Sequence, residues 1–487
     1  MGLRLYNTIS RKIEEFISVE PGHVKLYVCG PTVYDLLHVG NFRGAVFFNF
    51  VRHWLEHLGY RVTFLYNYTD VDDKIIRRAR EEGVPASEIS TRYITEFKKD
   101  FKRLHLRSHE HNPKVTDHMG DIIALIERLA ERGVAYVSEG EVIFSIDKFP
   151  LYGKLSGKKI EELEAGARVE VNAKKRNPLD FVLWKPSKPD EPSWDSPWGP
   201  GRPGWHIECT AMIFKLLGER IDIHGGGIDL IFPHHENEIA QAEAASGTPY
   251  VKYWMHNNFI HFDDEKMSKS KGNVVTARVF FQDYHPEVMK YMMLSVHYRS
   301  MLNFSKTQIY QAIGSLARIY EAIRAGEEIL ESSGGARGDD PAPFAGALDA
   351  LKRDITEAVN EDFNTPVLFA KLFEAVRLFN AEILNTKDPG VKKAVAALFM
   401  KWVAFFGGMM SLFLEPPSEF LRALDDILLR EKQLDRAVID QKVQARVEAR
   451  ARKDFKKADA IRDELAGLGV EIRDTPAGTS WEVRKGE

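Results

Sequence analysis

Near the start of the chain, the pattern of apolar and polar positions predicts a strand, a helix and a second strand. Residues 25–29 form a short apolar run that ends at Gly30, which predicts a strand followed by a loop. Apolar residues recur at helical spacing over 40–58, and residues 61–67 are β-branched and aromatic. This order forms a βαβ unit, whose first loop lies at the carboxyl edge of a parallel sheet. Because open α/β sheets bind ligands at that edge, we expect the functional site there.

A second unit of the same kind follows after an interruption. Residues 135–204 alternate short strand-like runs with segments rich in Pro and Trp, which indicates an insertion. Residues 221–224 then predict a strand, and it is followed by Gly225-Gly226-Gly227, a helix over 234–245 and a strand over 250–255. The two units predict an α/β fold, in which a split Rossmann-type nucleotide-binding domain with a parallel sheet carries an insertion.

Beyond residue 273 the pattern becomes helical. Amphipathic or apolar periodicity covers four segments: 305–326, 344–359, 367–384 and 391–414. These segments predict an all-α helical bundle, and the charged end of the chain predicts a small α+β module. Residues 395–414 are apolar enough to imitate a membrane span, but Lys401 lies in their middle, so we expect a buried helix of the bundle.

Composition narrows the class of protein. The chain has 487 residues, of which 44% are hydrophobic and 28% charged, and this excludes a disordered, collagen-like or coiled-coil chain. The formal net charge of −4 does not by itself indicate a nucleic-acid binder. Residues 442–457 are a local exception, because seven Lys/Arg residues stand there against two acidic residues. Such a basic stripe suits phosphate neutralisation, and a solvated helix face is the alternative.

The use of cysteine points to a reducing compartment. Cys29 and Cys209 are the two cysteines of the chain, which excludes a disulfide scaffold and a four-cysteine metal site. The N-terminal segment lacks the apolar core of a signal peptide. We therefore expect a cytoplasmic protein that does not contact a membrane.

The loop between the first strand and the first helix carries candidate phosphate-binding residues. Residues 31–41 read PTVYDLLHVGN. Gly40 at the helix entry lets a phosphate or ribose approach closely, and the helix N-terminus supplies free N–H donors and a positive dipole. His38 can donate to a phosphate oxygen. A histidine that only caps the helix gives the same pattern, so the pattern alone leaves both interpretations open.

A second motif is cationic. Residues 266–272 read KMSKSKG, with lysines at Lys266, Lys269 and Lys271. Lysines interleaved with serines suit the negative charge that develops on a triphosphate as pyrophosphate leaves. A solvated basic loop is the alternative for a KxxK spacing, and the five-residue string KMSKS is more specific than that spacing.

Four further residues have side chains that suit a metal ion. His234 and Glu238 are four residues apart on a predicted helix, so they share one face. Cys29 ends the first strand, and Cys209 ends the segment GWHIEC. Two thiolates, one imidazole and one carboxylate suit zinc in number and softness. Two buried free cysteines and a surface His–Glu pair are the alternative. The rival ligands by the same criterion are His224 and His235.

Together these motifs resemble those of class I aminoacyl-tRNA synthetases, in which the first is the HIGH signature and the second is KMSKS. Within that class the chain is similar to the cysteinyl-tRNA synthetase family, essentially from end to end. The resemblance rests on seven segments: 27–35 (YVCGPTVYD), 69–76 (TDVDDKII), 201–209 (GRPGWHIEC), 222–230 (DIHGGGIDL), 232–238 (FPHHENE), 362–366 (DFNTP) and 458–465 (ADAIRDEL). At position 41 the chain has asparagine where the HIGH signature has histidine. An amide can donate a hydrogen bond, but without the charge of an imidazolium.

The resemblance implies roles for individual residues. It implies one zinc ion per chain, held by Cys29, Cys209, His234 and Glu238, with His234 preferred to His235. For catalysis it implies His38, Lys266 and Lys269. The residues implied for binding Mg·ATP are Thr32, His38, Gly40, Asn41, Gly226, Gly227 and Lys269. Those implied for the substrate cysteine are Thr69, Trp205 as a lid and Asp229 as the partner of the ammonium group.

The resemblance also implies a reaction. L-Cysteine and ATP with Mg²⁺ would give cysteinyl-adenylate and pyrophosphate, and cysteine would then pass to the terminal adenosine of tRNA(Cys). An apolar pocket separates cysteine from serine by only ~10–200-fold. A soft metal that takes a thiolate separates them further, so we expect no editing domain. The implied partners are tRNA(Cys), ATP and L-cysteine, and the family suggests a monomer.

Two alternatives belong to other classes of protein. An ATP-dependent cysteine ligase of the mycothiol pathway, which acts on a small amine, resembles the catalytic half of the chain. Such an enzyme needs no tRNA-binding tail, and a long helical region follows the catalytic half here. A non-catalytic RNA-binding or cysteine-sensing paralogue would not need His38, Lys266 and Lys269.

The resemblance divides the chain into six parts. They are the first half of the catalytic domain (1–110), the connective insertion (111–204), the second half with the KMSKS loop (205–275), a stem-contact linker (276–310), a tRNA-binding helical bundle (311–430) and an anticodon-recognition module (431–487). The basic residues 442–457 and Trp481, an aromatic suited to stacking on a base, lie in the last part.

Overall fold

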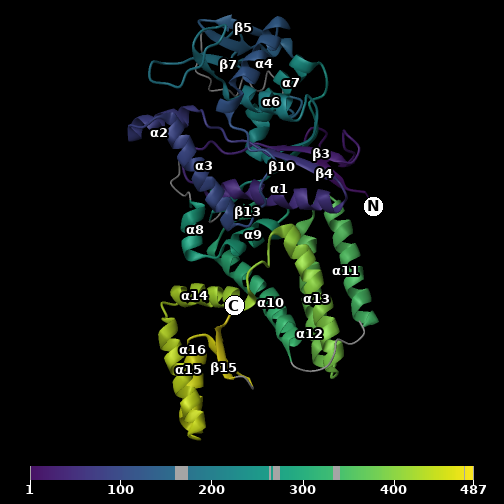
Figure 1. Cartoon of the computed structure of the whole chain (residues 1–487), viewed down its shortest axis with the longest axis vertical. Helices are drawn as coiled ribbons and strands as arrows, with labels where there is room; N and C mark the ends of the chain where they lie inside the picture. Colours follow the sequence, from purple (N-terminus) through teal and green to yellow (C-terminus); the bar gives the residue numbers. More distant parts are fainter. Residues whose placement is uncertain are drawn as a thin grey trace.

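The chain folds around a four-stranded parallel sheet (Figure 1). The computed structural model describes residues 2–158, 174–262, 265–266, 275–332, 341–475 and 478–485. The strand order is β10-β9-β3-β4, with β3 (His23–Val28), β4 (Arg61–Tyr66), β9 (Ile221–Gly227) and β10 (Val251–Asn257). The two halves of the chain meet where β3 pairs with β9, with Leu26 opposite Ile223. The predicted split parallel sheet is therefore confirmed.

Helix α1 (Val39–His57) lies between this sheet and the helical bundle (Figure 1). It is apolar on several sides, and Phe42, Phe48 and Trp54 are fully buried. A β-carbon at Gly225 of β9 would lie 2.2 Å from the Phe48 ring, so glycine allows the helix to pack close to the sheet. We predicted that this strand ends at residue 224, but β9 continues to Gly227 and pairs with the end of β10.

The insertion lies on the other side of the sheet (Figure 1). Its antiparallel sheet has the order β5-β6-β7-β8, with β5 (Ala135–Ser138), β6 (Glu141–Phe144), β7 (Phe181–Pro186) and β8 (Gly201–Pro203). The Pro- and Trp-rich segment, residues 184–203, therefore begins within β7 and ends with β8. The helices on this side are α4 (Met119–Glu131), α6 (Trp205–Leu216) and α7 (Glu236–Ser246). Two further helices, α2 (Asp73–Glu82) and α3 (Ala86–Arg103), follow β4.

Two small strand groups flank the central sheet. A hairpin of β1 (Arg4–Asn7) and β2 (Lys12–Glu15) contacts β10. A three-stranded group has the order β12-β11-β13, with β11 (Ile260–Phe262), β12 (Glu265–Lys266) and β13 (Leu302–Asn303). It continues directly from β10, so it lies near the carboxyl edge of the sheet.

The remainder of the described chain is mostly helical, as predicted. It comprises α8 (Ala277–Asp283), α9 (Pro286–Ser295), α10 (Lys306–Glu331), α11 (Ala342–Asn360), α12 (Thr365–Asn385), α13 (Pro389–Met410), α14 (Pro417–Glu431), α15 (Arg436–Ala451) and α16 (Phe455–Gly467). A hairpin of β14 (Val470–Thr475) and β15 (Gly478–Val483) completes the predicted α+β module.

Helix α13 is the apolar segment that imitates a membrane span. It is the single helix in the described residues whose length and composition would allow it to cross a membrane. It packs against α10, α11, α12 and α1, and side chains such as Val395, Phe399 and Phe406 are buried. The prediction of a buried bundle helix is therefore confirmed.

Candidate active site

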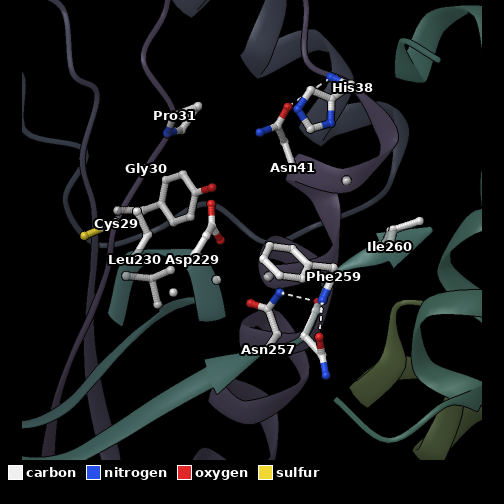
Figure 2. A pocket seen from close by; sticks show the side chains of 17 residues that line it. Cys29, Gly30, Pro31, His38, Asn41, Asp229, Leu230, Asn257, Phe259 and Ile260 are labelled. Atoms are coloured by element: carbon white, nitrogen blue, oxygen red, sulfur yellow. Dashed lines mark hydrogen bonds between the residues drawn. The ribbon is translucent and has the colours of Figure 1, made fainter. Parts of the chain in front are cut away.

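A cavity of about 320 Å³ opens at the carboxyl ends of the parallel strands, where the sequence predicted a ligand site. It is lined by Val28, Cys29, Gly30, Pro31, His38, Gly40, Asn41, Gly44, Tyr66, Gly226, Gly227, Asp229, Leu230, Asn257, Asn258, Phe259 and Ile260. Figure 2 shows Cys29 on one side, with Asp229 next to it, and His38 with Asn41 on the other, with Phe259 below them. The cavity therefore joins the metal candidate to the first signature motif.

The first signature motif forms the entrance to α1. His38 is the N-cap residue of the helix, and its backbone N–H donates to Oδ1 of Asn41 at 3.0 Å. Backbone bonds tie this entrance to the residues that follow the second motif, from Val39 N–H to the carbonyl of Val275 (3.0 Å) and from Ala277 N–H to that of Leu37 (2.9 Å). The capping interpretation of His38 is thus compatible with its position at the cavity.

The second signature motif falls largely outside the described residues. β12 places the backbone of Lys266 opposite His261 of β11. Lys269 and the side chain of Lys266 lie outside the described part of the chain. Their proposed roles therefore rest on the sequence and on the position of the flanking segments.

The four metal candidates converge, although Cys29 is far from the others in sequence. Their ligand atoms all lie within 4.8 Å of one another. The Sγ atoms of Cys29 and Cys209 are 4.0 Å apart, and Nε2 of His234 lies 3.5 Å and 3.6 Å from them. Oε1 of Glu238 lies 3.0 Å from Nε2 of His234 and 3.8 Å from Sγ of Cys29.

These distances fit tetrahedral zinc. Zinc bonds of about 2.3 Å to sulfur and about 2.0 Å to nitrogen or oxygen give tetrahedral edges of about 3.8 Å between sulfurs and about 3.3 Å between nitrogen and oxygen. The observed separations of 4.0 Å and 3.0 Å lie close to both values. The donor set therefore suits zinc in geometry as well as in chemistry.

A second group of four donors overlaps the first. It consists of Cys29, His224, His235 and Glu238. His224 Nε2 lies 3.0 Å from Oε2 of Glu238, and His235 Nε2 lies 3.5 Å from Sγ of Cys29. The rival histidines named from the sequence are thus next to the centre.

Neighbouring histidines orient this cluster. Nδ1 of His206 lies 2.9 Å from Nδ1 of His234, and Nδ1 of His235 lies 2.8 Å from Nε2 of His256. Burial lowers the pKa of His206 and His235 well below its usual range. Both rings are therefore neutral at physiological pH and can act as hydrogen-bond partners of the cluster.

The electrostatics of the cluster favour ionisation of two of the four ligands, Cys209 and Glu238. The Cys29 thiol beside Cys209 lowers the pKa of Cys209 to about 6, whereas burial raises that of Cys29. Burial opposes the charge on Glu238, but His224 and His234 outweigh it and lower its pKa to about 2. Burial also lowers the pKa of His234, but Glu238 and Cys209 outweigh it and raise this pKa to about 10, so a metal that binds here displaces a proton from the imidazole.

The residues predicted to contact the substrate cysteine lie in two places. Asp229 lines the cavity, and the Trp205 ring stacks on His234 at 4.3 Å with 42% of the residue exposed. Thr69 does not line the cavity, and neither does Thr32, which was predicted to bind ATP. The two threonines form a backbone bridge with each other. The Thr69 N–H donates to the carbonyl of Pro31 at 3.3 Å, so this pair shapes the loop that carries Pro31.

Sequence reasoning missed one wall of the cavity. Tyr66, Leu230, Asn257, Asn258, Phe259 and Ile260 line it without having been predicted. Asn257-Asn258 follows the predicted strand, which ends at residue 255, after the single residue His256. Polar residues at the end of a parallel strand were the signal that could have found them.

The basic segment 442–457 is partly occupied by internal ion pairs. Arg446 makes two hydrogen bonds to Asp474, at 2.9 Å and 2.8 Å, and Arg450 also pairs with Asp474. Lys442 pairs with Glu464 at 2.6 Å. Three of the seven cations in this segment, Lys442, Arg446 and Arg450, are therefore paired with carboxylates of the same chain.

Trp481, proposed for base stacking, also has partners inside the protein. Its indole N–H donates to Asp440 at 2.7 Å, and the Arg436 guanidinium lies 4.6 Å from its ring centre. One face of the ring is therefore covered by a cation within the chain.

The divided parallel sheet, the cavity at its carboxyl edge and the HIGH segment at the entrance to α1 are features of the class I aminoacyl-tRNA synthetases. *Mycobacterium tuberculosis* methionyl-tRNA synthetase in complex with methionyl-adenylate shares this fold, with a TM-score of 0.62 and 15% sequence identity over 82% of this chain and 93% of that one. Residues 15–314 match the model of the "tRNA synthetases class I (C) catalytic domain".

Two further models match the helical region. Residues 354–410 match the DALR domain, and residues 439–481 match the cysteinyl-tRNA ligase anticodon binding domain. The cysteine–tRNA ligases of *Bdellovibrio bacteriovorus* and *Geobacter sulfurreducens* are 53% and 46% identical to the chain, over 99% of this chain and 100% of each relative. The chain belongs to the cysteine–tRNA ligase family and is an aminoacyl-tRNA synthetase.

Proposed function

We propose that the protein activates L-cysteine with Mg·ATP and transfers it to the 3′-terminal adenosine of tRNA(Cys). The observation that carries the proposal is the convergence of Cys29, Cys209, His234 and Glu238 beside the nucleotide-sized cavity. The family and the anticodon-binding model support tRNA as the acceptor. The cysteine–tRNA ligases that the chain resembles over its length support cysteine as the amino acid.

We propose that these four residues hold one zinc ion, with His234 rather than His235 as the imidazole ligand. The choice is supported by Cys209, which belongs only to the first group of donors. When bound, zinc supplies a soft Lewis acid that takes the thiolate of cysteine and not the hydroxyl of serine. In the same arrangement His224 donates to Glu238 and His206 bonds to His234, so both hold ligands in orientation.

For ATP, we propose binding along the entrance to α1. Gly40, Asn41, Gly226 and Gly227 line the cavity and leave room for the ribose and phosphates against the backbone. Thr32 belongs to the same loop. His38 would donate to the phosphates, and Lys266 and Lys269 would neutralise charge as pyrophosphate leaves, with Mg²⁺ carried by ATP.

For the substrate, we propose that Asp229 pairs with the cysteine ammonium group and Trp205 covers the side chain. The Asp229 carboxylate faces the cavity in Figure 2, on the side of Cys29. The half-exposed Trp205 ring already lies against His234. Thr69 would act by holding the 31–33 loop and by contacting the substrate. A carboxylate is the partner that a cation needs in a site closed from water.

The remaining proposals concern the whole chain. We propose a monomer that works in the cytoplasm, in which 311–430 and 431–487 contact tRNA and 276–310 contacts its stem. The small-amine ligase is the less favoured function, because the DALR and anticodon-binding models match the region that such an enzyme would not need.

Cysteine-dependent exchange of pyrophosphate with ATP tests this function, together with aminoacylation of total tRNA. We expect exchange with L-cysteine and charging of one tRNA species, with no transfer to an amino sugar. Transfer to an amino sugar without charging of tRNA would favour the small-amine ligase. The absence of pyrophosphate exchange in metal-replete protein would exclude the proposed activation of cysteine.

A further inference from the structure

The cavity wall at Phe259 is held in place by a residue of α1. Arg43 lies one turn after the HIGH entrance and is 1% exposed. Its guanidinium donates to the carbonyl of Phe259 at 2.5 Å and to that of Tyr298 at 3.4 Å, and it also bonds to the carbonyl of Ser300. One buried cation therefore links the helix of the first signature motif, the cavity wall and the segment 297–300.

The segment 297–300 is held in turn by the helical bundle. Asp362, in the loop between α11 and α12, is 2% exposed. Its Oδ1 accepts from the hydroxyl of Tyr298 at 2.6 Å, and its Oδ2 accepts from Nε of Arg299 at 2.7 Å. The backbone N–H of Tyr6 also donates to Oδ1 at 2.8 Å. This carboxylate therefore links the bundle to the N-terminal hairpin and to the segment 297–300 behind the cavity wall.

Tyr298 connects Asp362 to the cavity wall. Its ring stacks on Phe47 of α1 at 4.2 Å with an angle of 11° between the rings. Its carbonyl accepts the N–H of Asn258 at 2.9 Å, and Asn258 and Phe259 both line the cavity. A displacement of Tyr298 would therefore reach the wall across a single hydrogen bond.

The chemistry of Asp362 indicates that it positions its hydrogen-bond donors rather than adding to bulk stability. A buried ion pair, replaced as a whole by apolar residues of similar volume, often leaves a protein as stable or more stable, so the pair of Asp362 and Arg299 is weak evidence for a role in bulk stability. The carboxylate instead fixes the direction of three specific donors, from Tyr298, Arg299 and Tyr6. Asp362 also has φ of 59°, a left-handed conformation that Asp and Asn adopt more readily than most other residues.

We propose that Asp362 is a positioning residue for the nucleotide cavity, acting through the Tyr298 hydroxyl on the wall at Asn258 and Phe259. The proposal rests on the proposed function, because it takes this cavity to be the ATP site. It assigns a role to the DFNTP segment, which lies in the helical bundle outside the cavity. Through it, the bundle would set the geometry in which ATP binds.

Two conservative variants test the proposal. Tyr298→Phe removes one hydroxyl and keeps the ring on Phe47, and Asp362→Asn keeps the backbone preference while removing the charge. We expect each to raise KM for ATP in the exchange reaction by about 3- to 10-fold, the range of one net hydrogen bond, with KM for cysteine and metal content unchanged. The double variant should be little worse than either single variant, because Tyr298→Phe removes the hydrogen bond that Asp362→Asn weakens.

Glu361→Gln is the matched control in the same loop. Glu361 pairs with Arg4 at 3.1 Å on the surface, and both side chains are about half exposed. We expect it to leave both KM values unchanged. Unchanged KM for ATP in both test variants, or a loss of thermal stability and kcat with both KM values constant, would overturn the proposal. The proposed function fails separately, if the parent protein shows no exchange with cysteine.

Discussion

The metal ligands show how single residues from distant parts of the chain form one site. Cys29 directly follows β3, which ends one residue earlier than predicted, and Cys209 lies on α6 after the insertion. His234 lies in a π-helical turn before α7, which contains an extended Phe232, and yet it faces Glu238 one turn later. Each ligand is therefore fixed by a different element, which orients the donors before a metal arrives.

Replacement of one thiol tests the proposed centre. We expect Cys209→Ser to weaken zinc binding by at least about 100-fold, because a hydroxyl is a poor and protonated ligand. Metal analysis after dialysis against a competing chelator measures this loss. Met212→Leu, a volume-conserving change at a buried position of the same helix, should keep the metal content of the parent. Full zinc content in Cys209→Ser would contradict the ligand set.

Lys290 provides a test of electrostatics away from the site. It is fully buried on α9, where its ammonium donates to the carbonyl of Ser411, and burial lowers its pKa to about 8. Its unfolded pKa is near 10.4. Between these values the unfolded chain binds more protons than the folded chain, so this lysine makes stability rise with pH.

We therefore expect Lys290→Met to remove that rise. The free energy of unfolding, measured by denaturant from pH 7.5 to 10, should increase less with pH in the variant than in the parent. The buried partner Glu287 keeps hydrogen bonds from Tyr320 and from the backbone at Phe413 and Leu414, so it is not left bare. Equal slopes in the two proteins would show that Lys290 is not perturbed by folding.

At the scale of elements, the packing of α1 against β9 depends on one glycine. Gly225→Ala would place a methyl group 2.2 Å from the Phe48 ring, at a strand position buried on both faces. Overpacking of this kind costs about 1–3 kcal/mol. We expect a lower free energy of unfolding and reduced exchange activity, since the helix carries the HIGH entrance.

The control for this change is another glycine-to-alanine substitution in open space. A β-carbon at Gly120, in the first turn of α4, meets nothing within 4 Å. Gly120→Ala should leave stability unchanged or raise it slightly, because alanine favours helix over glycine. A similar loss of stability in both variants would refute the packing argument.

The elements were largely predictable, because both βαβ units have apolar runs of distinct period. The prediction failed where glycine is used for packing: the Gly225-Gly226-Gly227 run indicates a loop locally, but α1 and β10 make it a strand. The chemistry of the four metal ligands suggested them as a group, but only the resemblance preferred this set to its alternatives, since no local pattern connects Cys29 to Cys209. The wall at Asn257–Ile260 was missed because strand order, and not sequence, places the end of β10 beside the end of β9.

At the scale of the whole molecule, α1 connects the cavity to the helical bundle. One end of the helix carries His38 and Asn41 at the cavity, and its side chains bond to the bundle through Asn49 to Ser411 at 3.1 Å and Trp54 to Asn360 at 2.9 Å. The C-terminal module lies at the far end of the chain from the insertion (Figure 1).

The central claim is that a metal held by Cys29, Cys209, His234 and Glu238 selects the sulfur of the substrate. Cobalt(II) in place of zinc tests it directly, because thiolate-to-cobalt charge-transfer absorption reports each sulfur ligand. We expect L-cysteine to increase this absorption in the intact protein and L-serine to leave it unchanged. No response to cysteine in cobalt protein that still activates cysteine, or an equal response to serine, would contradict the account.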